Sequence, residues 1–262
     1  ARTKNAPART PPTDVSAPRR KIPRERIDGV LLLDKPLGLS SNTALQTARR
    51  LLNAAKAGHT GTLDPMATGL LPLTFGEATK FSQRLLDADK EYLATLRLGV
   101  ETDSGDAEGQ EISRAPVAVD AAQLEQALAG LRGEIEQIPP MYSALKRDGK
   151  PLYEYARAGI EVERAPRPVT IFTLECLAFD ADELRLRIRC SKGTYVRSLA
   201  IDLGRALGCG AHLTALRRTA IGPFSIDTAV TLEQLEASGD ATALLAPPDA
   251  LIAECPRLDL DE

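Results

Sequence analysis

Residues 58–73 read GHTGTLDPMATGLLPL and form the most informative stretch of the chain. The stretch holds three glycines, two prolines and three threonines, but only one carboxylate, that of Asp64. Glycine permits backbone conformations that other residues resist, and proline fixes φ, so we expect a tightly shaped, non-helical loop. Pro65 also favours an extended conformation at Asp64. The apolar run of residues 70–75 is expected to anchor this loop in a core.

The Asp64-Pro65 pair has two interpretations. Asp-Pro commonly opens a turn, and the residues by themselves favour this ordinary structural role. The alternative is a catalytic loop that presents a single carboxylate to a substrate. The longer pattern around the pair is needed to choose between the two.

That longer pattern resembles the signature of pseudouridine synthases of the TruB type. The resemblance includes residues 76–80, which read GEATK, and a match of this length is more specific than a short phosphate-loop motif. It implies that Asp64 is the essential catalytic aspartate. It also implies an α+β fold, with a large mixed, mainly antiparallel sheet flanked by helices and an insertion that clasps the substrate.

Composition bounds the class of protein. The chain has 262 residues, 43% of them hydrophobic, which suffices for one large domain or two modest ones. The four cysteines form no CxxC pair, which is typical of idle thiols in a reducing cytosol. Two histidines without an HExxH motif give no reason to expect a metal site. No run is long enough to cross a bilayer and no signal peptide opens the chain, so we expect a cytoplasmic protein without a membrane partner.

Charge is distributed unevenly along the chain. Residues 1–26 carry eight basic and two acidic side chains, whereas residues 231–262 carry one basic and eight acidic ones. We expect residues 1–26 to be a disordered basic arm, which either attracts phosphates or has no role. Residues 27–245 are expected to form the catalytic domain, with an acidic tail at 246–262. Family members usually continue into a small RNA-binding domain related to the PUA fold, which we expect to be absent or truncated here.

The elements around the central loop can be predicted from spacing. Residues 29–34 are an apolar run closed by Lys35-Pro36, which predicts a buried strand. Residues 40–42 offer a helix N-cap, and Gly58 would suit the end of that helix. The helical spacing itself is carried by Leu45, Ala48, Leu52 and Ala55. The Lys35-Pro36 pair also resembles a second family motif, which implies structural support for the active site.

Further along, alternation predicts strands at 92–100 and 184–190, and residues 121–131 and 197–207 are predicted helices. The acidic, glycine-containing stretch 101–110 is a predicted loop, and residues up to 235 a terminal strand and helix. Residues 138–144 are too rich in proline for a regular element. A basic and aromatic cluster that includes Lys146 follows, and either contacts RNA or is an ordinary surface helix. The resemblance favours RNA contact, because this region is similar to the family's mobile insertion.

The resemblance implies further active-site residues. Arg197 and Tyr195 lie in a segment similar to the one that places an arginine and a tyrosine beside the catalytic aspartate. Arg197 would keep Asp64 charged by pairing with it. Tyr92 resembles the tyrosine that stacks on the flipped base and takes the C5 proton. Without the resemblance, Arg197 would be interpreted as a charge on a helix surface.

A second group of residues is expected around the base and the RNA backbone. Leu216 matches a residue that lines the base pocket, and His59 matches the position where the base is everted. A loop histidine that caps a turn remains an alternative for His59. Arg217 and Arg218 are predicted phosphate contacts, and His212 is expected to have a structural role.

The implied reaction is the isomerisation of a uridine to pseudouridine. It involves no redox change and no external reactant, so we expect neither cofactor nor metal. The implied substrate is the T-arm of tRNA, with uridine 55 in its loop as target, acted on by a monomer without a protein partner. Three alternatives remain: an RNA-binding protein or tRNA-folding chaperone, a guide-RNA-dependent synthase, and an unrelated metabolic α/β enzyme.

Overall fold

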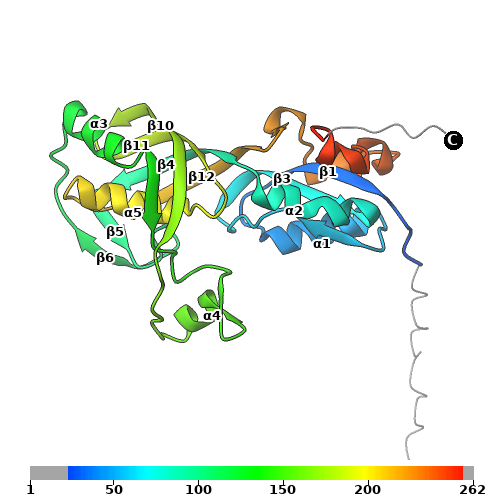
Figure 1. Cartoon of the computed structure of the whole chain (residues 1–262), viewed down its shortest axis with the longest axis horizontal. Helices are drawn as coiled ribbons and strands as arrows, with labels where there is room; N and C mark the ends of the chain where they lie inside the picture. Colours follow the sequence, from blue (N-terminus) through cyan, green and yellow to red (C-terminus); the bar gives the residue numbers. More distant parts are fainter. Residues whose placement is uncertain (1–22, 256–262) are drawn as a thin grey trace, which may run out of the picture.

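A mixed sheet organises the computed structural model, which describes residues 23–255 (Figure 1). Within these residues the sheet has nine strands, and every pair is antiparallel except β3 with β12. The predicted mixed, mainly antiparallel sheet is therefore confirmed. The order is β1 (Gly29–Lys35), β3 (Ala67–Phe75), β12 (Ala211–Ile221), β4 (Lys90–Leu98), β11 (Glu183–Cys190), β10 (Arg167–Asp180) and β7 (Gly133–Gln137), with β2 (Ala57–His59) on β3 and β13 (Phe224–Ser225) on β12.

Helices and two small hairpins complete the fold. The helices are α1 (Ser41–Leu51), α2 (Ser82–Asp87), α3 (Ala121–Gly130), α4 (Leu152–Arg157), α5 (Val196–Ala206) and α6 (Leu232–Ala237). Short 3₁₀ helices span Gly76–Phe81, Ile226–Thr228, Ala241–Leu244 and Pro248–Ile252. The hairpins pair β5 (Val100–Thr102) with β6 (Glu111–Arg114), and β8 (Lys146–Arg147) with β9 (Lys150–Pro151). None of the helices in residues 23–255 is long and apolar enough to cross a membrane.

The helix before the central loop is shorter than predicted. Its start is as expected, because the Ser40 side chain accepts a hydrogen bond from the Thr43 N–H. Its end is not at Gly58, which lies in β2 and pairs with Thr74. The helix stops after Leu51 because Asn53 adopts a left-handed conformation with φ 52°, a shape that asparagine tolerates better than most residues.

Alternation along the central strands separates a buried face of the sheet from an exposed one. Ala94, Leu96 and Leu98 of β4 are buried as predicted, and so are the apolar residues of β11. The arginines of β11 point to the other face, where Arg187 pairs with Glu175 at 3.0 Å. The exposed face is thus a salt-bridged sheet surface.

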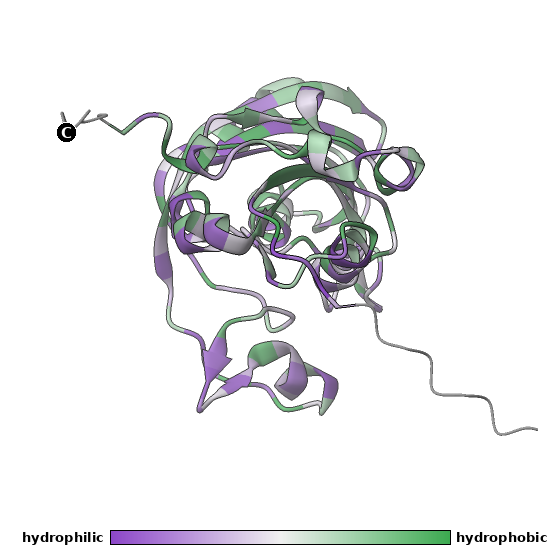
Figure 2. Ribbon diagram, turned by 90° about the vertical axis from the view of Figure 1, so that its right-hand side faces the viewer, coloured by the Kyte–Doolittle hydropathy of each residue, from purple (hydrophilic) through white to green (hydrophobic). Residues whose placement is uncertain are grey.

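The two ends of the sheet lie in two halves of the molecule (Figure 1). One half contains β1, β3, α1 and α2, and the other contains β10, β11, α3 and α5. They meet where β3 runs parallel to β12, and at Gly69 a side chain would place its Cβ 2.3 Å from the Arg218 carbonyl oxygen. Glycine is therefore required for this close approach. The segment that contains α4 stands away from both halves (Figures 1 and 2).

Candidate active site

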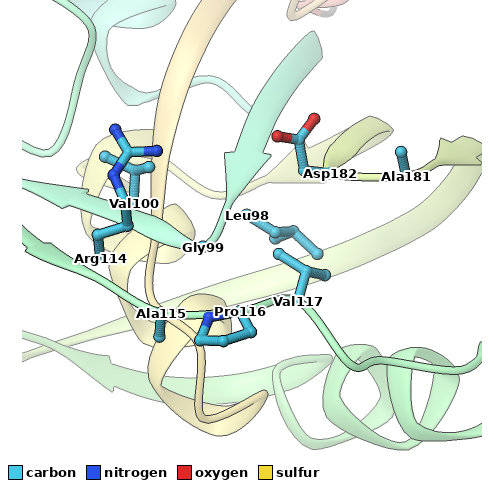
Figure 3. Close-up of a pocket in the computed structure, with 9 residues that line it drawn as sticks. All are labelled: Leu98, Gly99, Val100, Arg114, Ala115, Pro116, Val117, Ala181 and Asp182. Atoms are coloured by element: carbon cyan, nitrogen blue, oxygen red, sulfur yellow. The ribbon is translucent and has the colours of Figure 1, made fainter.

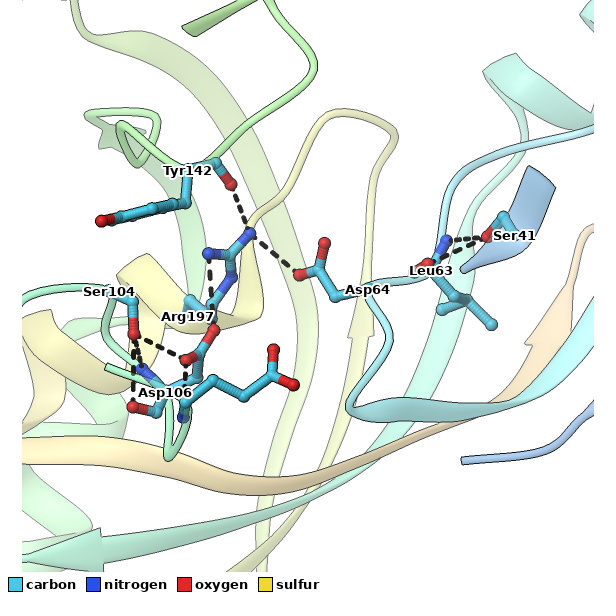
Figure 4. Close-up of polar contacts among 8 residues, drawn as sticks. Ser41, Leu63, Asp64, Ser104, Asp106, Tyr142 and Arg197 are labelled. Carbon is cyan, nitrogen blue, oxygen red and sulfur yellow. Dashed lines mark hydrogen bonds and ion pairs between the residues drawn. The ribbon is translucent and has the colours of Figure 1, made fainter. Parts of the chain in front are cut away.

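Asp64 lies on a turn that is fixed by backbone hydrogen bonds. The Ala67 N–H donates to the Asp64 carbonyl at 3.0 Å, and the Gly38 N–H donates to the Pro65 carbonyl at 2.8 Å. Before the turn, the buried Ser41 hydroxyl of α1 contacts both the N–H and the carbonyl of Leu63, at 2.7 and 2.9 Å (Figure 4). The Asp-Pro pair therefore does form a turn, and that turn presents the carboxylate.

Arg197 approaches this carboxylate from the other half of the molecule. It is the second residue of α5, and its Nη2 lies 2.9 Å from Asp64 Oδ2 (Figure 4). The same nitrogen donates to the Tyr142 carbonyl at 2.6 Å. The Arg197 side chain is only 7% exposed, whereas that of Asp64 is 40% exposed. The pair thus has a buried cation and a carboxylate that is still open on one side.

A second carboxylate, which was not predicted from the sequence, pairs with the other terminal nitrogen of Arg197. Asp106 Oδ2 lies 3.5 Å from Arg197 Nη1, and the Asp106 side chain is 5% exposed. The Ser104 hydroxyl donates to Asp106 Oδ1 at 2.6 Å, and the Glu108 N–H donates to the same oxygen at 3.1 Å. Residues 101–110 were predicted only to be an acidic, glycine-containing loop. The Ser104-Gly105-Asp106 turn was the available signal, but without a partner it did not distinguish this acid from its neighbours.

The surroundings of Asp64 act on its pKa in opposite directions. Burial by the surrounding protein is the largest effect and raises the pKa of the carboxyl above its usual value. The positive charges of Arg197 and Lys35 lower the pKa, and the negative charge of Asp106 raises it. The net direction is upward. Arg197 therefore stabilises the ionised form without fully compensating for burial.

Lys35 lies beneath the turn and is fully buried. Its ammonium donates to the carbonyls of Pro36 and Leu39, at 2.9 and 2.6 Å. Burial lowers the pKa of Lys35 to about 8, although nearby Asp64 opposes this shift. Because the turn held by Lys35 also contains Gly38, which binds Pro65, this lysine braces the loop that carries Asp64.

Arg218 is not placed as predicted. Arg218 is only 1% exposed. Its guanidinium donates hydrogen bonds to the carbonyls of Leu70 and Gly61, at 2.7 and 3.3 Å. A guanidinium so committed does not fit the predicted contact with phosphate, and we correct that expectation. Arg218 instead joins β12 to β3 and to the glycine-rich loop.

Tyr92 and His59 lie within the electrostatic influence of this buried arginine. Burial raises the pKa of Tyr92, and the charge of Arg218 opposes the rise. Burial and Arg218 both lower the pKa of His59, which favours the neutral imidazole. Within the described part of the chain, His59 Nδ1 is buried and has no hydrogen-bond partner. His59 therefore does not cap a turn through this nitrogen.

The remaining predicted residues occupy different surroundings. Tyr195 is half-buried at the start of α5, and Leu216 is half-buried opposite Ala67. Arg217 makes a two-pronged contact with Asp34, at 3.0 and 2.7 Å. Lys146 is exposed in the β8–β9 hairpin. His212, expected to be structural, is buried and contacts the Val100 carbonyl at 2.8 Å.

A cavity of about 580 Å³ lies elsewhere, between residues 98–100, 114–117 and 181–182 (Figure 3). It contains none of the predicted site residues. Among residues 23–255, no group of three or more histidine, cysteine, aspartate or glutamate side chains is arranged to hold a metal ion. The residues brought together at the candidate site are one partly open carboxylate, its arginine and nearby tyrosines.

Comparison with known proteins identifies two family domains in this chain and several relatives of high identity. The N-terminal domain of the TruB family of pseudouridylate synthases matches residues 49–196, and the tRNA pseudouridylate synthase B C-terminal domain matches residues 197–252. The chain is 73% identical over 240 residues to tRNA pseudouridine synthase B of Aromatoleum aromaticum, covering 91% of this chain and 78% of that protein. It is 68% identical over 243 residues to tRNA pseudouridine synthase B of an Azoarcus species, covering 92% and 81%.

A solved structure agrees with the sequence relatives. The crystal structure of a Cbf5–Nop10–Gar1 complex contains a chain that superposes with a TM-score of 0.67 and is 32% identical. The match covers 86% of this chain and 61% of that one. With two family domains matched in succession and relatives of such high identity, the chain belongs to the TruB family of pseudouridylate synthases, which are isomerases.

Proposed function

We propose that this enzyme converts uridine 55 in the T-loop of tRNA to pseudouridine, with Asp64 as the reacting carboxylate. The observation that carries the proposal is the Asp64–Arg197 pair at 2.9 Å, in a member of a pseudouridylate synthase family. The names of the relatives, tRNA pseudouridine synthase B, support tRNA as the substrate.

The reaction exchanges one bond to the ribose for another. The bond from C1′ to N1 breaks, a bond from C1′ to C5 forms, C5 loses a proton and N1 gains one. Asp64 acts either by attacking the substrate, at C1′ of the sugar or on the base, or by removing the C2′ proton to form a glycal. Each route requires an ionised carboxylate close to its target, and Arg197 supports that form against the effect of burial. Because the substrate is isomerised and neither gains nor loses electrons overall, the reaction needs no redox cofactor.

The target base must leave its stack before Asp64 can reach it. In the proposed complex, Tyr92 stacks on the flipped uracil and accepts the C5 proton. Burial raises the pKa of Tyr92 and the charge of Arg218 only partly opposes the rise, so the free phenol is held protonated and its support for this role is the stacking surface of its ring. Tyr195 and Leu216 line the pocket, and neutral His59 stands where the base is everted.

The RNA backbone is held by groups outside this pocket. Lys146 is exposed in the β8–β9 hairpin, so it can reach phosphate. Arg217 keeps part of its surface exposed while pairing with Asp34. We assign the catalytic unit to residues 27–245, because β12 follows residue 197 and yet lies between β3 and β4 in the sheet. The enzyme is proposed to act as a monomer in the cytoplasm.

A transcript of tRNA labelled with tritium at uridine C5 tests this function. We expect the protein alone to release tritium and to leave pseudouridine at position 55. Release from other uridines would contradict the proposed target. Binding without release would favour the RNA-binding or tRNA-folding alternative, and release only after addition of a guide RNA and protein partners would favour the guided alternative.

A further inference from the structure

A buried side-chain amide at the end of β7 forms hydrogen bonds with the start of α5. Gln137 is only 2% exposed. Its Nε2 donates to the Tyr195 carbonyl at 3.0 Å, and its Oε1 accepts from the Tyr195 N–H at 2.7 Å. One side chain thus satisfies both backbone groups of a residue that is 58 positions away in sequence.

Tyr195 is the residue from which α5 begins. Its carbonyl also accepts the first helical hydrogen bond, from the Leu199 N–H at 3.1 Å, and its own side chain does not cap the helix. An unmade hydrogen bond to a buried backbone group is costly, so the amide of Gln137 fixes where the helix starts. Arg197 follows two residues later, in the first turn.

Two further contacts join the same segments. The Ser198 hydroxyl donates to the Ile138 carbonyl at 2.9 Å, and Arg197 Nη2 donates to the Tyr142 carbonyl at 2.6 Å. Both acceptors are backbone carbonyls just after β7, on the chain that leads into the insertion. Gln137 is the side chain among these that both donates and accepts a hydrogen bond.

We propose that Gln137 is a positioning residue for the isomerisation: by anchoring Tyr195 it sets Arg197, and through Arg197 it orients Asp64. This inference rests on the proposed function for its kinetic consequences. It does not require Gln137 to touch the substrate. A small displacement of α5 would separate Arg197 from Asp64, and misplacement by about 1 Å can reduce a rate about 100-fold.

Replacement of both hydrogen-bonding groups is the first test. Gln137→Met keeps the length and approximate volume of the side chain but neither donates nor accepts. We expect kcat to fall about 10-fold or more, with KM for the RNA within about twofold of the native value, because the exposed RNA contacts are unchanged. An unchanged kcat, or a loss confined to KM, would overturn the proposal.

A protonation test separates positioning from a general effect on folding. In Gln137→Glu the protonated acid can donate to the Tyr195 carbonyl and accept from its N–H, as the amide does, whereas the carboxylate can only accept. Burial raises the pKa of such an acid, and the positive charges of Arg167 on β10 and Arg197 on α5 lower it. The ratio of variant to native kcat should therefore fall as pH rises from about 5 to about 9.

Because native enzyme is measured at every pH, the ratio removes the pH dependence that the two proteins share, including the titration of Asp64 at its native pKa. The matched control is Gln123→Glu, at an exposed glutamine in the capping box of α3, where either residue serves. Its ratio should be constant with pH. If the kcat ratio of Gln137→Glu to native enzyme were also constant with pH, the proposal would be contradicted. This test can be applied even if Gln137→Met does not fold.

Amide hydrogen exchange provides a readout that does not depend on activity. Peptides that cover residues 195–199 should exchange faster in Gln137→Met, and faster in Gln137→Glu at high pH than at low pH after correction for the intrinsic rate. Unchanged protection would show that Gln137 does not anchor α5. If anchoring were confirmed but native protein released no tritium, the proposed function would fail and the anchoring would stand.

Discussion

The two sides of the ion pair are built in different ways. Asp64 is placed by its own neighbourhood, through the turn that ends at Ala67 and the backbone contact of Pro65 with Gly38. Arg197 is placed by distant groups, namely Asp106 and the Tyr142 carbonyl. A local loop thus supplies the carboxylate, and long-range packing supplies the charge that favours its ionised form. Changes on the two sides should therefore have different signatures.

The largest effect should come from removing the charge of Arg197. In Arg197→Gln we expect kcat to fall by about 10²–10³-fold, because the reacting carboxylate loses its charged partner. Arg197 lowers the pKa of Asp64, so its loss raises that pKa further and moves the acidic limb of the pH–rate profile to higher pH. The control is Arg205→Gln, an exposed arginine on the same helix. An unmoved acidic limb would contradict the assigned pairing.

Asp106→Asn should reduce kcat less than Arg197→Gln does, and it should shift the acidic limb of the pH–rate profile in the opposite direction. The side chain keeps its shape but no longer attracts Arg197, so kcat should fall about 10-fold. The charge of Asp106 raises the pKa of Asp64, and its removal should move the acidic limb to lower pH. Asp103→Asn, at an exposed position in the same loop, is the control. A shift in the same direction as in Arg197→Gln would show that Asp106 does not act through charge.

The difference between the two sides also explains what the sequence could reveal. The glycines and prolines around Asp64 constrain the chain locally, so the shape of the loop and its carboxylate were predictable. Arg197 was identified through a resemblance over its own segment. Asp106 was not, because its partner is 91 positions away and nothing in residues 101–110 distinguishes a buried acid from a solvated one.

Other errors have the same origin. Arg218 was predicted to contact phosphate, yet the pairing of β12 with β3 buries it. That parallel pairing joins residues about 150 positions apart, so no local pattern indicates it. Tyr142 contributes a backbone carbonyl, which every residue has. The strands expected at 92–100 and 184–190 and the helices expected at 121–131 and 197–207 follow local periodicity and are present, whereas β7 and β10 were not predicted.

On the Asp64 side, loss of a local brace should cost stability more than activity. Ser41→Ala leaves the buried N–H and carbonyl of Leu63 without their partner, which should lower the free energy of unfolding by about 1–3 kcal/mol. Thermal or urea unfolding measures this loss, and kcat should fall only a few-fold because the other contacts of the turn remain. Ser113→Ala, at an exposed position in β6, should be neutral. A large loss of kcat without a loss of stability would contradict the bracing role.

The smallest effect on chemistry should come from the exposed insertion. Lys146→Ala should leave kcat unchanged and raise KM a few-fold, because the lysine is proposed to contact phosphate outside the pocket. The slope of log affinity against log salt concentration should become shallower by about 1 unit. An unchanged slope would remove Lys146 from the RNA interface, and a changed kcat would place it closer to the chemistry than proposed.

Single-turnover tritium release by Asp64→Asn is the most direct test of the central claim, that Asp64 performs the chemistry. The substitution keeps the size of the side chain and removes only its capacity to ionise. We predict that the variant binds a T-arm stem-loop with an affinity close to that of the native enzyme and releases no tritium above background. Release at a rate near the native one, with the RNA fully bound, would contradict the assignment of Asp64.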